Sequence, residues 1–362
     1  MGVTQLAFHV TDRCQLDCIH CLRDPEKKPV DLPLELIARV LDEVGHLHGT
    51  SHISLTGGEP TLHPQFVALI DAIAARGMTW HMISNGRTFG WLLDAFAGRP
   101  GRREAMTQVY FSLDGADEET HDRIRGPGSF REVMSACALA TANGIPLVLQ
   151  LVVNAINQAQ IEAFGMLASQ LGAMRVSFCV AQPTGTLHDR VLFLSPAQWW
   201  QVSDRLDRLA HTLRIEVRTP EGWPQKQPFH VCEVFQSRQL HVDVQGRLNL
   251  CCQHAGIPQS ESPPSGESDV VADLRETSLG QAQVRLLGVI HRAEAARLSQ
   301  LDAGGARDAW DDFPCNWCLA HFGKPHWRGD GATGPTAERE RWVGAWGEPK
   351  GQAPRSRLRV IR

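Results

Sequence analysis

Three cysteines lie close together near the start of the chain, where Cys14, Cys18 and Cys21 form a C-x3-C-x2-C spacing. Paired C-x2-C hooks normally supply the four ligands of a structural zinc site, so this spacing is unusual for zinc. Iron–sulfur clusters bind one cysteine thiolate per iron, so three thiolates in one loop can hold three irons of a 4Fe–4S cluster. The fourth iron then stays open and can bind and reduce a small molecule. A three-cysteine zinc site is the alternative interpretation of these residues.

A second set of four cysteines lies in the C-terminal half of the chain. Thirteen residues separate Cys232 from Gly246, four more precede Cys251, and Cys315 and Cys318 form a C-x2-C hook. Four thiolates make a closed tetrahedral site, which on chemistry alone suits either zinc or a 4Fe–4S cluster. The chain has ten cysteines. In a reducing compartment, clustered cysteines usually serve metal binding or catalysis and not disulfides.

Short β-rich runs alternate with helical patterns over the first 215 or so residues. Between the first two runs, Pro33–Leu47 places apolar residues at helical spacing. Such repeats predict a parallel sheet with helices on its outer face, and sheets of this kind carry their chemistry at the carboxyl ends of the strands. The six predicted strands are Gln5–Val10, His52–Thr56, Thr79–Ser84, Val109–Leu113, Leu147–Val153 and Arg175–Val180.

Short motifs follow the ends of the strands after the first. The second strand leads into Thr56-Gly57-Gly58-Glu59-Pro60, the third into Ser84-Asn85-Gly86, and the fourth into Ser112-Leu113-Asp114-Gly115. Two glycines let the backbone approach a ligand closely. A carboxylate and free backbone carbonyls can accept strong hydrogen bonds from an ammonium group. Each motif alone is only a turn signal, but their order, one for each strand end, indicates one shared site.

The cysteine loop and these motifs together resemble the radical S-adenosylmethionine (SAM) superfamily. In that family the open iron binds the methionine part of SAM, and a ring-bearing residue precedes the third cysteine, as His20 does here. The resemblance covers residues 3–215 and implies a partial (β/α)6 barrel with a catalytic 4Fe–4S cluster on Cys14, Cys18 and Cys21. The SAM-binding residues that it implies are Gly57, Gly58, Glu59, Pro60, Ser84, Asn85, Ser112, Asp114 and, within 121–126, Arg125.

The second cysteine set resembles the SPASM and twitch extensions of radical SAM proteins, which open with C-x(9–15)-G-x4-C and carry auxiliary clusters. A full SPASM domain continues with further cysteines, whereas residues 319–324 contain none. The resemblance implies one auxiliary 4Fe–4S cluster, with zinc as the alternative. Cys252 is expected to point away, because neighbouring side chains on a strand alternate, and His254, His321 and His326 are expected as hydrogen-bond partners near the ligands. The implied ligands are Cys232, Cys251, Cys315 and Cys318.

From this resemblance we expect a radical SAM oxidoreductase or maturase. It would cleave SAM reductively to a 5′-deoxyadenosyl radical, which takes hydrogen from a substrate bound near 182–185 and His188. The SPASM-like region favours oxidation or cross-linking of a ribosomally made peptide. The single auxiliary site favours a dehydrogenase or cyclase acting on a small molecule, and a non-catalytic iron–sulfur or zinc module is a remote third reading. The expected electron donor is a reductant such as flavodoxin or ferredoxin.

The predicted organisation has three parts. A core barrel over 1–215 is followed by a small twitch-like α+β domain over 216–328 and a poorly ordered tail over 329–362. The 36 basic and 40 acidic residues nearly balance, which leaves no electrostatic footprint for nucleic acid. No apolar run is long enough to span a membrane, and the N-terminus lacks a signal-peptide pattern. We therefore expect a cytoplasmic protein without nucleic-acid or membrane partners.

Overall fold

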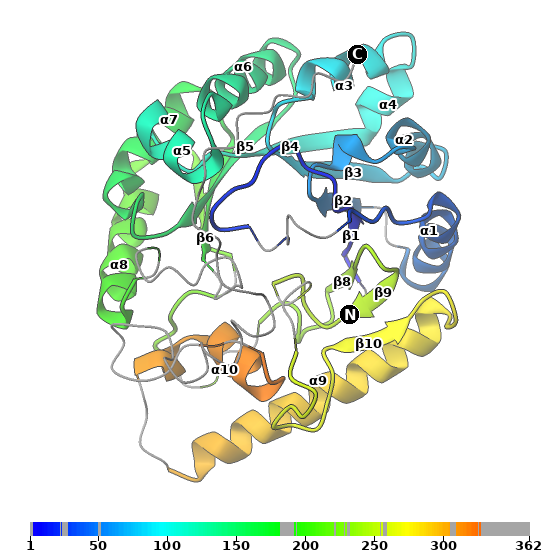
Figure 1. Cartoon of the computed structure of the whole chain (residues 1–362), viewed down its shortest axis with the longest axis vertical. Helices are drawn as coiled ribbons and strands as arrows, with labels where there is room; N and C mark the ends of the chain where they lie inside the picture. Colours follow the sequence, from blue (N-terminus) through cyan, green and yellow to red (C-terminus); the bar gives the residue numbers. More distant parts are fainter. Residues whose placement is uncertain are drawn as a thin grey trace.

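One sheet of ten strands runs through the described part of the chain (Figure 1). Its order is β10-β9-β8-β1-β2-β3-β4-β5-β6-β7; neighbours from β8 to β7 are parallel, and β9 runs antiparallel to β8 and β10. The computed structural model describes residues 3–21, 23, 28–49, 52–181, 192, 194–220, 222–227, 229, 232–253, 255, 259–304, 309–324 and 326. The strands are β1 (Gln5–Thr11), β2 (His52–Gly57), β3 (Thr79–Ser84), β4 (Met106–Ser112), β5 (Leu147–Val153), β6 (Arg175–Val180), β7 (Glu216–Arg218), β8 (Gln239–Val242), β9 (Arg247–Asn249) and β10 (Val270–Asp273).

Helices follow the parallel strands and cover the outer face of the curved sheet, which confirms the predicted partial barrel (Figure 1). No helix within the described ranges is long and apolar enough to cross a membrane. The α-helices are α1 (Leu34–His48), α2 (Phe66–Ala74), α3 (Phe89–Phe96), α4 (Pro100–Ala105), α5 (Glu118–Arg125), α6 (Ser129–Ala142), α7 (Ile161–Gln170), α8 (Pro196–Thr212), α9 (Leu279–Asp302) and α10 (Pro314–His321). The short 3-10 turns are η1 (Pro60–Leu62), η2 (Gln158–Gln160) and η4 (Ala309–Asp312).

Helix α1 shows how the local sequence specifies these elements. Pro33 precedes its first turn, and Gly49 ends it with φ of 63°, a left-handed conformation that glycine adopts without steric cost. The apolar residues predicted to form one face are indeed buried: Leu36, Ile37, Val40, Leu41 and Val44. Amphipathic spacing and a glycine stop are therefore enough to position this helix against the sheet.

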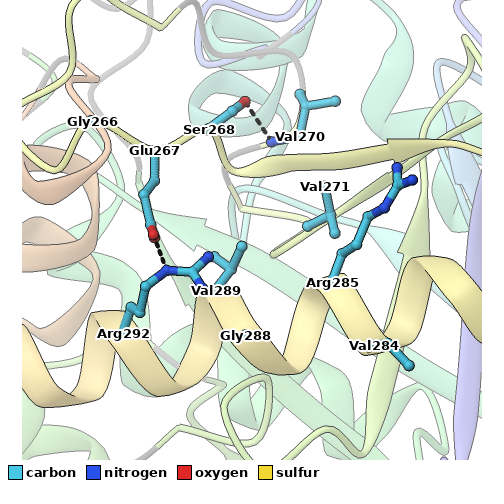
Figure 2. Close-up of a pocket in the computed structure, with 10 residues that line it drawn as sticks. All are labelled: Gly266, Glu267, Ser268, Val270, Val271, Val284, Arg285, Gly288, Val289 and Arg292. Atoms are coloured by element: carbon cyan, nitrogen blue, oxygen red, sulfur yellow. Dashed lines mark hydrogen bonds and ion pairs between the residues drawn. The ribbon is translucent and has the colours of Figure 1, made fainter.

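The sheet continues across the predicted domain boundary at residue 215. β7 extends it from β6, and β8 extends it on the other side from β1. The segment 239–250 forms a hairpin of β8 and β9, with the turn at Gly246. β10 then pairs with β9, and α9 lies alongside β10; residues of both elements line an open groove (Figure 2). α9 ends at Asp302, and the predicted tail over 329–362 lies outside the described residues.

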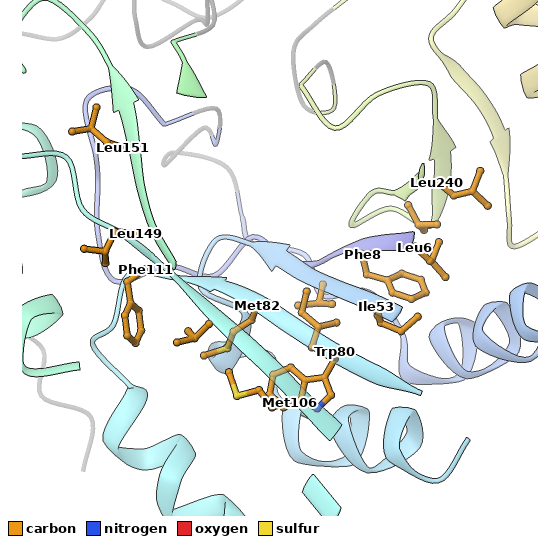
Figure 3. Close-up of a cluster of buried hydrophobic side chains, with 14 of the residues drawn as sticks. Leu6, Phe8, Ile53, Trp80, Met82, Met106, Phe111, Leu149, Leu151 and Leu240 are labelled. Atoms are coloured by element: carbon orange, nitrogen blue, oxygen red, sulfur yellow. The ribbon is translucent and has the colours of Figure 1, made fainter. Parts of the chain in front are cut away.

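Large apolar side chains fill the space between the sheet and its helices (Figure 3). Phe8 of β1 and Trp80 of β3 are fully buried there, and Trp80 meets Phe66 of α2 edge to face at 6.1 Å. Burying a side chain of this size stabilises the fold by roughly 1.5–3 kcal/mol. Because strand residues alternate, His9 and His81 point to the opposite, concave face.

Polar side chains fill part of that concave face. His81 bonds to His52 at 2.7 Å between ring nitrogens, and its ring lies 5.0 Å from that of Tyr110. Burial lowers the pKa of His81 to about 3, so the ring is neutral at pH 7. The contact between His52 and His81 joins the first residue of β2 to the third residue of β3, so it lies away from the carboxyl ends of the strands, where the site is expected.

Candidate functional site

The cysteines of the first group lie in the loop that follows β1, at the carboxyl end of the sheet. Cys18 lies within electrostatic range of both Cys14 and Cys21, so the structure brings the three together. The Asn85 amide donates to Cys14 Sγ and the Arg125 guanidinium to Cys18 Sγ, both over 3.8 Å. Burial raises the pKa of the Cys18 thiol to about 12. Its thiolate therefore forms only where a positive group such as a metal compensates for the lost hydration.

The paired glycines after β2 pack directly against this cysteine loop. The N–H groups of Gly58 and Glu59 donate to the carbonyls of Thr11 and Arg13, each over 2.7 Å. A Cβ on Gly57 would lie 2.4 Å from the Thr11 oxygen, and one on Gly58 would lie 2.2 Å from the Arg13 oxygen. Sequence reasoning expected these glycines to admit a ligand. The close approach that the structure shows is to the backbone of the cysteine loop.

Glu59 lies at the centre of a buried hydrogen-bond network. Its side chain is fully buried, and its carboxylate accepts from Thr61 Oγ1 at 2.8 Å, Ser84 Oγ at 3.0 Å and the Asn85 N–H at 2.8 Å. Burial raises the pKa of Glu59, and these donors partly compensate for the lost hydration of its charge. The carboxylate therefore fixes the turn after β3. Its expected contact with an ammonium group of SAM stays a prediction.

Asp114, after β4, is a second buried hub. Its side chain is fully buried and accepts from His20 Nε2 and Arg125 Nε, each at 2.5 Å, and from the Val152 N–H at 2.8 Å. Burial opposes ionisation of Asp114, but Arg125 and His20 outweigh it and hold the pKa of the carboxyl well below its usual range. This network orients Arg125 toward Cys18 and His20 beside Cys21. The expected contacts of Asp114 and Arg125 with SAM are not tested by these interactions.

The other two residues predicted to bind SAM lie on the same edge of the sheet. Pro60 begins η1 and is buried. Ser112 ends β4, is half-buried and lies in register with Gln150 of β5. Pro60 therefore follows the end of β2 and Ser112 lies at the end of β4, and their expected contacts with SAM stay predictions.

The four cysteines of the second group are also brought together. Cys251 lies within electrostatic range of Cys232 and Cys315, and Cys318 lies within range of Cys232. Burial raises the pKa of Cys318. Cys252 is exposed, but its thiol lies within hydrogen-bond range of the Cys251 thiol, and both residues follow the end of β9, so the expected divergence of the two side chains stays a prediction.

Two buried cations that were not predicted from the sequence border this second group. Arg297 of α9 is 4% exposed and lies within electrostatic range of Cys318. Lys324 is 3% exposed and lies within range of Cys251. Their partners are distant in the sequence, so no local motif could reveal them.

The structure describes two of the three histidines that were predicted near the second cysteine group, His321 and His326. The His321 ring stacks on Trp317, with centroids 4.7 Å apart, and a ring nitrogen of His326 bonds to the Lys324 carbonyl at 2.8 Å. Their expected roles beside the ligands stay predictions. His254, the segment 182–185 and His188 lie outside the described residues.

The donor sets of both groups suit iron–sulfur clusters. Among the residues that the structure describes, no three Cys, His, Asp or Glu side chains converge closely enough to share one metal ion. In a 4Fe–4S cluster each thiolate binds its own iron, so the sulfurs need not converge on a point. Sulfur-only donor sets of three and four cysteines are the sets that such clusters use.

Comparison with known proteins gives a consistent result. Residues 8–165 match the radical SAM superfamily. The mycofactocin maturase MftC of Mycobacterium tuberculosis is 32% identical over 170 residues, a match that spans 46% of this chain and only 42% of that protein. The PqqA peptide cyclase of Gluconobacter oxydans is 29% identical over 265 residues, spanning 71% of this chain and 72% of that protein.

Solved structures share the fold. The crystal structure of Streptococcus suis SuiB bound to S-adenosylmethionine covers 80% of this chain and 68% of its own, with a TM-score of 0.61 at 14% identity. The structure of anSMEcpe with bound AdoMet covers 96% of this chain and 93% of its own, with a TM-score of 0.61 at 13% identity. Residues 8–165, which contain the cysteine loop after β1, are therefore similar in sequence to the radical SAM superfamily, and the chain shares its fold with these solved structures.

Proposed function

We propose that this protein is a radical SAM maturase that oxidises or cross-links a ribosomally made peptide. The observation that carries the proposal is the loop of Cys14, Cys18 and Cys21 at the carboxyl end of β1, bordered by donors from the neighbouring strand ends. The peptide substrate is supported by the relatives, which are a mycofactocin maturase and a PqqA peptide cyclase.

The three thiolates of this loop would hold a 4Fe–4S cluster, and SAM would bind beside it. When bound, these cofactors supply reductive cleavage of SAM to a 5′-deoxyadenosyl radical, with the electron coming from a flavodoxin or ferredoxin. The chain's own residues shape the site. Asn85 and Arg125 donate to sulfurs of the loop, which stabilises thiolate charge, and Glu59 and Asp114 hold these two donors in place. Backbone carbonyls of the turn after β2 are left as candidate acceptors for the ammonium group of SAM.

Cys232, Cys251, Cys315 and Cys318 would hold a second, auxiliary 4Fe–4S cluster. Four thiolates leave no iron open for a small substrate, so this cluster would accept the electron that remains after hydrogen abstraction. Removing a hydrogen atom and then an electron makes the net change an oxidation, which suits dehydrogenation or cross-linking. The proximity of Cys251 to Cys232 and Cys315, and of Cys318 to Cys232, supports this ligand set.

The first cluster is tested by exchanging Cys14, Cys18 and Cys21 for alanine together. Anaerobically reconstituted wild-type protein should hold about eight irons, and the triple variant about four. Formation of 5′-deoxyadenosine from SAM with dithionite should be lost in the variant. Cys252→Ala is the matched control and should leave both iron content and SAM cleavage unchanged. Full SAM cleavage by the triple variant would remove the basis of the proposal.

The second cluster is tested with the double variant Cys315→Ala/Cys318→Ala. This variant should lose about four irons and still form 5′-deoxyadenosine, because hydrogen abstraction precedes the electron transfer. Loss of about one zinc with all iron retained would instead assign the site to structural zinc. Unchanged metal content would contradict both assignments.

A further inference from the structure

A buried ion pair lies beside the second cysteine group. Lys324 Nζ lies 2.7 Å from Asp269 Oδ2, and the two side chains are 3% and 1% exposed. Ion pairs buried this deeply lose much of their attraction to the cost of desolvation, so they contribute little to stability compared with apolar packing. Packing stability alone therefore does not explain why a lysine is buried at this position.

The pair joins the two arms of the chain that carry the cysteines. On one arm, the Asp269 carbonyl accepts the N–H of Leu250, which directly precedes Cys251. On the other, the Lys324 N–H donates to the Leu319 carbonyl at the end of α10, the helix that contains Cys315 and Cys318. Lys324 lies within electrostatic range of the Cys251 sulfur. It therefore places a positive charge beside the cysteine group, where the ion pair with Asp269 holds it.

We infer that Lys324, held in place by Asp269, is a positioning residue whose charge raises the reduction potential of the auxiliary cluster. This inference rests on the proposed function, because it assumes a cluster at the second cysteine group. Four thiolates make the bound group anionic, and accepting an electron adds one more negative charge. A cation fixed nearby, where little water screens it, stabilises the reduced form more than the oxidised form. A higher potential favours transfer of an electron from a substrate radical to the cluster.

The experiment measures the midpoint potential of the auxiliary cluster alone. All proteins are full-length and carry Cys14→Ala, Cys18→Ala and Cys21→Ala, so that only the second group can hold iron. In this background Lys324→Met removes the charge and keeps the length of the side chain. Lys324→Arg keeps the charge, and Asp269→Asn removes the offsetting carboxylate. The matched control is Arg292→Met, which breaks the Arg292–Glu267 ion pair on the exposed side of α9 (Figure 2).

Opposite shifts are expected for the two partners in a redox titration followed by absorbance and electron paramagnetic resonance. Lys324→Met should disfavour reduction by at least tenfold, about 59 mV for a one-electron couple. The shift is expected even if Asp269 takes up a proton in this variant, because the positive charge of Lys324 is absent. Asp269→Asn should raise the potential, and Lys324→Arg and Arg292→Met should stay near the parent value.

The outcomes separate this inference from the proposed function. If the parent triple variant binds no iron, the auxiliary cluster itself is absent and the proposed function fails at that step. If iron is bound and neither Lys324→Met nor Asp269→Asn moves the potential, the electrostatic role is wrong while the cluster stands. If the Lys324→Met variant no longer binds iron, the test rests on Asp269→Asn. An unchanged or lowered potential of the cluster in the Asp269→Asn variant overturns the inference.

Discussion

The buried hub at Asp114 allows a direct test of whether its carboxylate serves the fold or the ligand. We consider Asp114→Asn, which keeps the shape of the side chain and removes its charge. In the wild type this carboxylate accepts from Arg125 and His20 at 2.5 Å each, with no solvent exposure of its own. The substitution leaves the Arg125 guanidinium, whose side chain is 9% exposed, without its counter-ion.

Breaking a buried pair in this way costs about 3–5 kcal/mol, because the remaining charge stays desolvated. The matched control is Glu162→Gln, which removes the carboxylate that pairs with Arg205 where the two side chains are 49% and 25% exposed. Exposed pairs contribute about 0–1 kcal/mol. The assay is urea unfolding of iron-free, reduced protein at pH 7, so that any loss belongs to the chain and not to a cofactor.

Two results would refute this reasoning. If Asp114→Asn lowers the free energy of unfolding by no more than Glu162→Gln does, Asp114 does not stabilise the fold. If stability and iron content are also unchanged while calorimetry shows weaker SAM binding, the carboxylate is a ligand contact, as the family resemblance implied. A loss of several kcal/mol in the iron-free protein supports the buried hub.

Two further substitutions test other parts of the structure. Gly58→Ala would place a Cβ 2.2 Å from the Arg13 oxygen and should destabilise the chain by about 1–3 kcal/mol and reduce iron binding. The control is Gly90→Ala in α3, whose Cβ would meet only Leu139, at 4.0 Å, and which should be neutral or stabilising. Equal urea midpoints for the two variants would contradict the tight contact at Gly58. Burial lowers the pKa of His81 to about 3, so between that pH and its usual pKa of about 6.5 the unfolded chain binds a proton that the folded chain does not. The free energy of unfolding therefore falls by about 1.4 kcal/mol for each unit by which the pH falls in this range. His81→Gln should reduce the difference in stability between pH 7 and pH 5, and an unchanged slope would show that His81 is not the group responsible.

Much of the fold was predictable because it depends on local periodicity. β3, β5 and β6 begin and end where alternation and β-branched residues predicted. The strand β10 and the helix α10 were not predicted. β10 has only four residues and follows a loop rich in proline and serine, and the eight residues of α10 contain two cysteines and no apolar period. Elements this short are stabilised by tertiary contacts more than by their own sequence.

The candidate site, like the fold, was predictable only in part. The sequence placed the cysteines and the strand-end motifs on one edge of the sheet because parallel strands bring their carboxyl ends together. It could not show which polar groups the protein itself would satisfy. Glu59 and Asp114, which are predicted to contact SAM, are each fully buried with at least three protein donors. Four of these six contacts join residues 25 to 94 positions apart, so no spacing rule reveals them.

The protein donors around Glu59 and Asp114 change how variants of the strand-end motifs should be interpreted. A buried carboxylate that already accepts several hydrogen bonds cannot be removed without leaving its donors unpaired, which costs about 1–3 kcal/mol for each group. Loss of SAM cleavage in a Glu59 or Asp114 variant therefore does not identify a ligand contact by itself, because a displaced Asn85 or Arg125 would disturb the cysteine loop first. Only a variant that keeps the stability of the iron-free chain can report on binding. Of the polar side chains predicted to contact SAM, Ser112 is half-buried at a strand end and lies outside both buried networks. Ser112→Ala is therefore the substitution whose effect on SAM affinity can be attributed to the ligand.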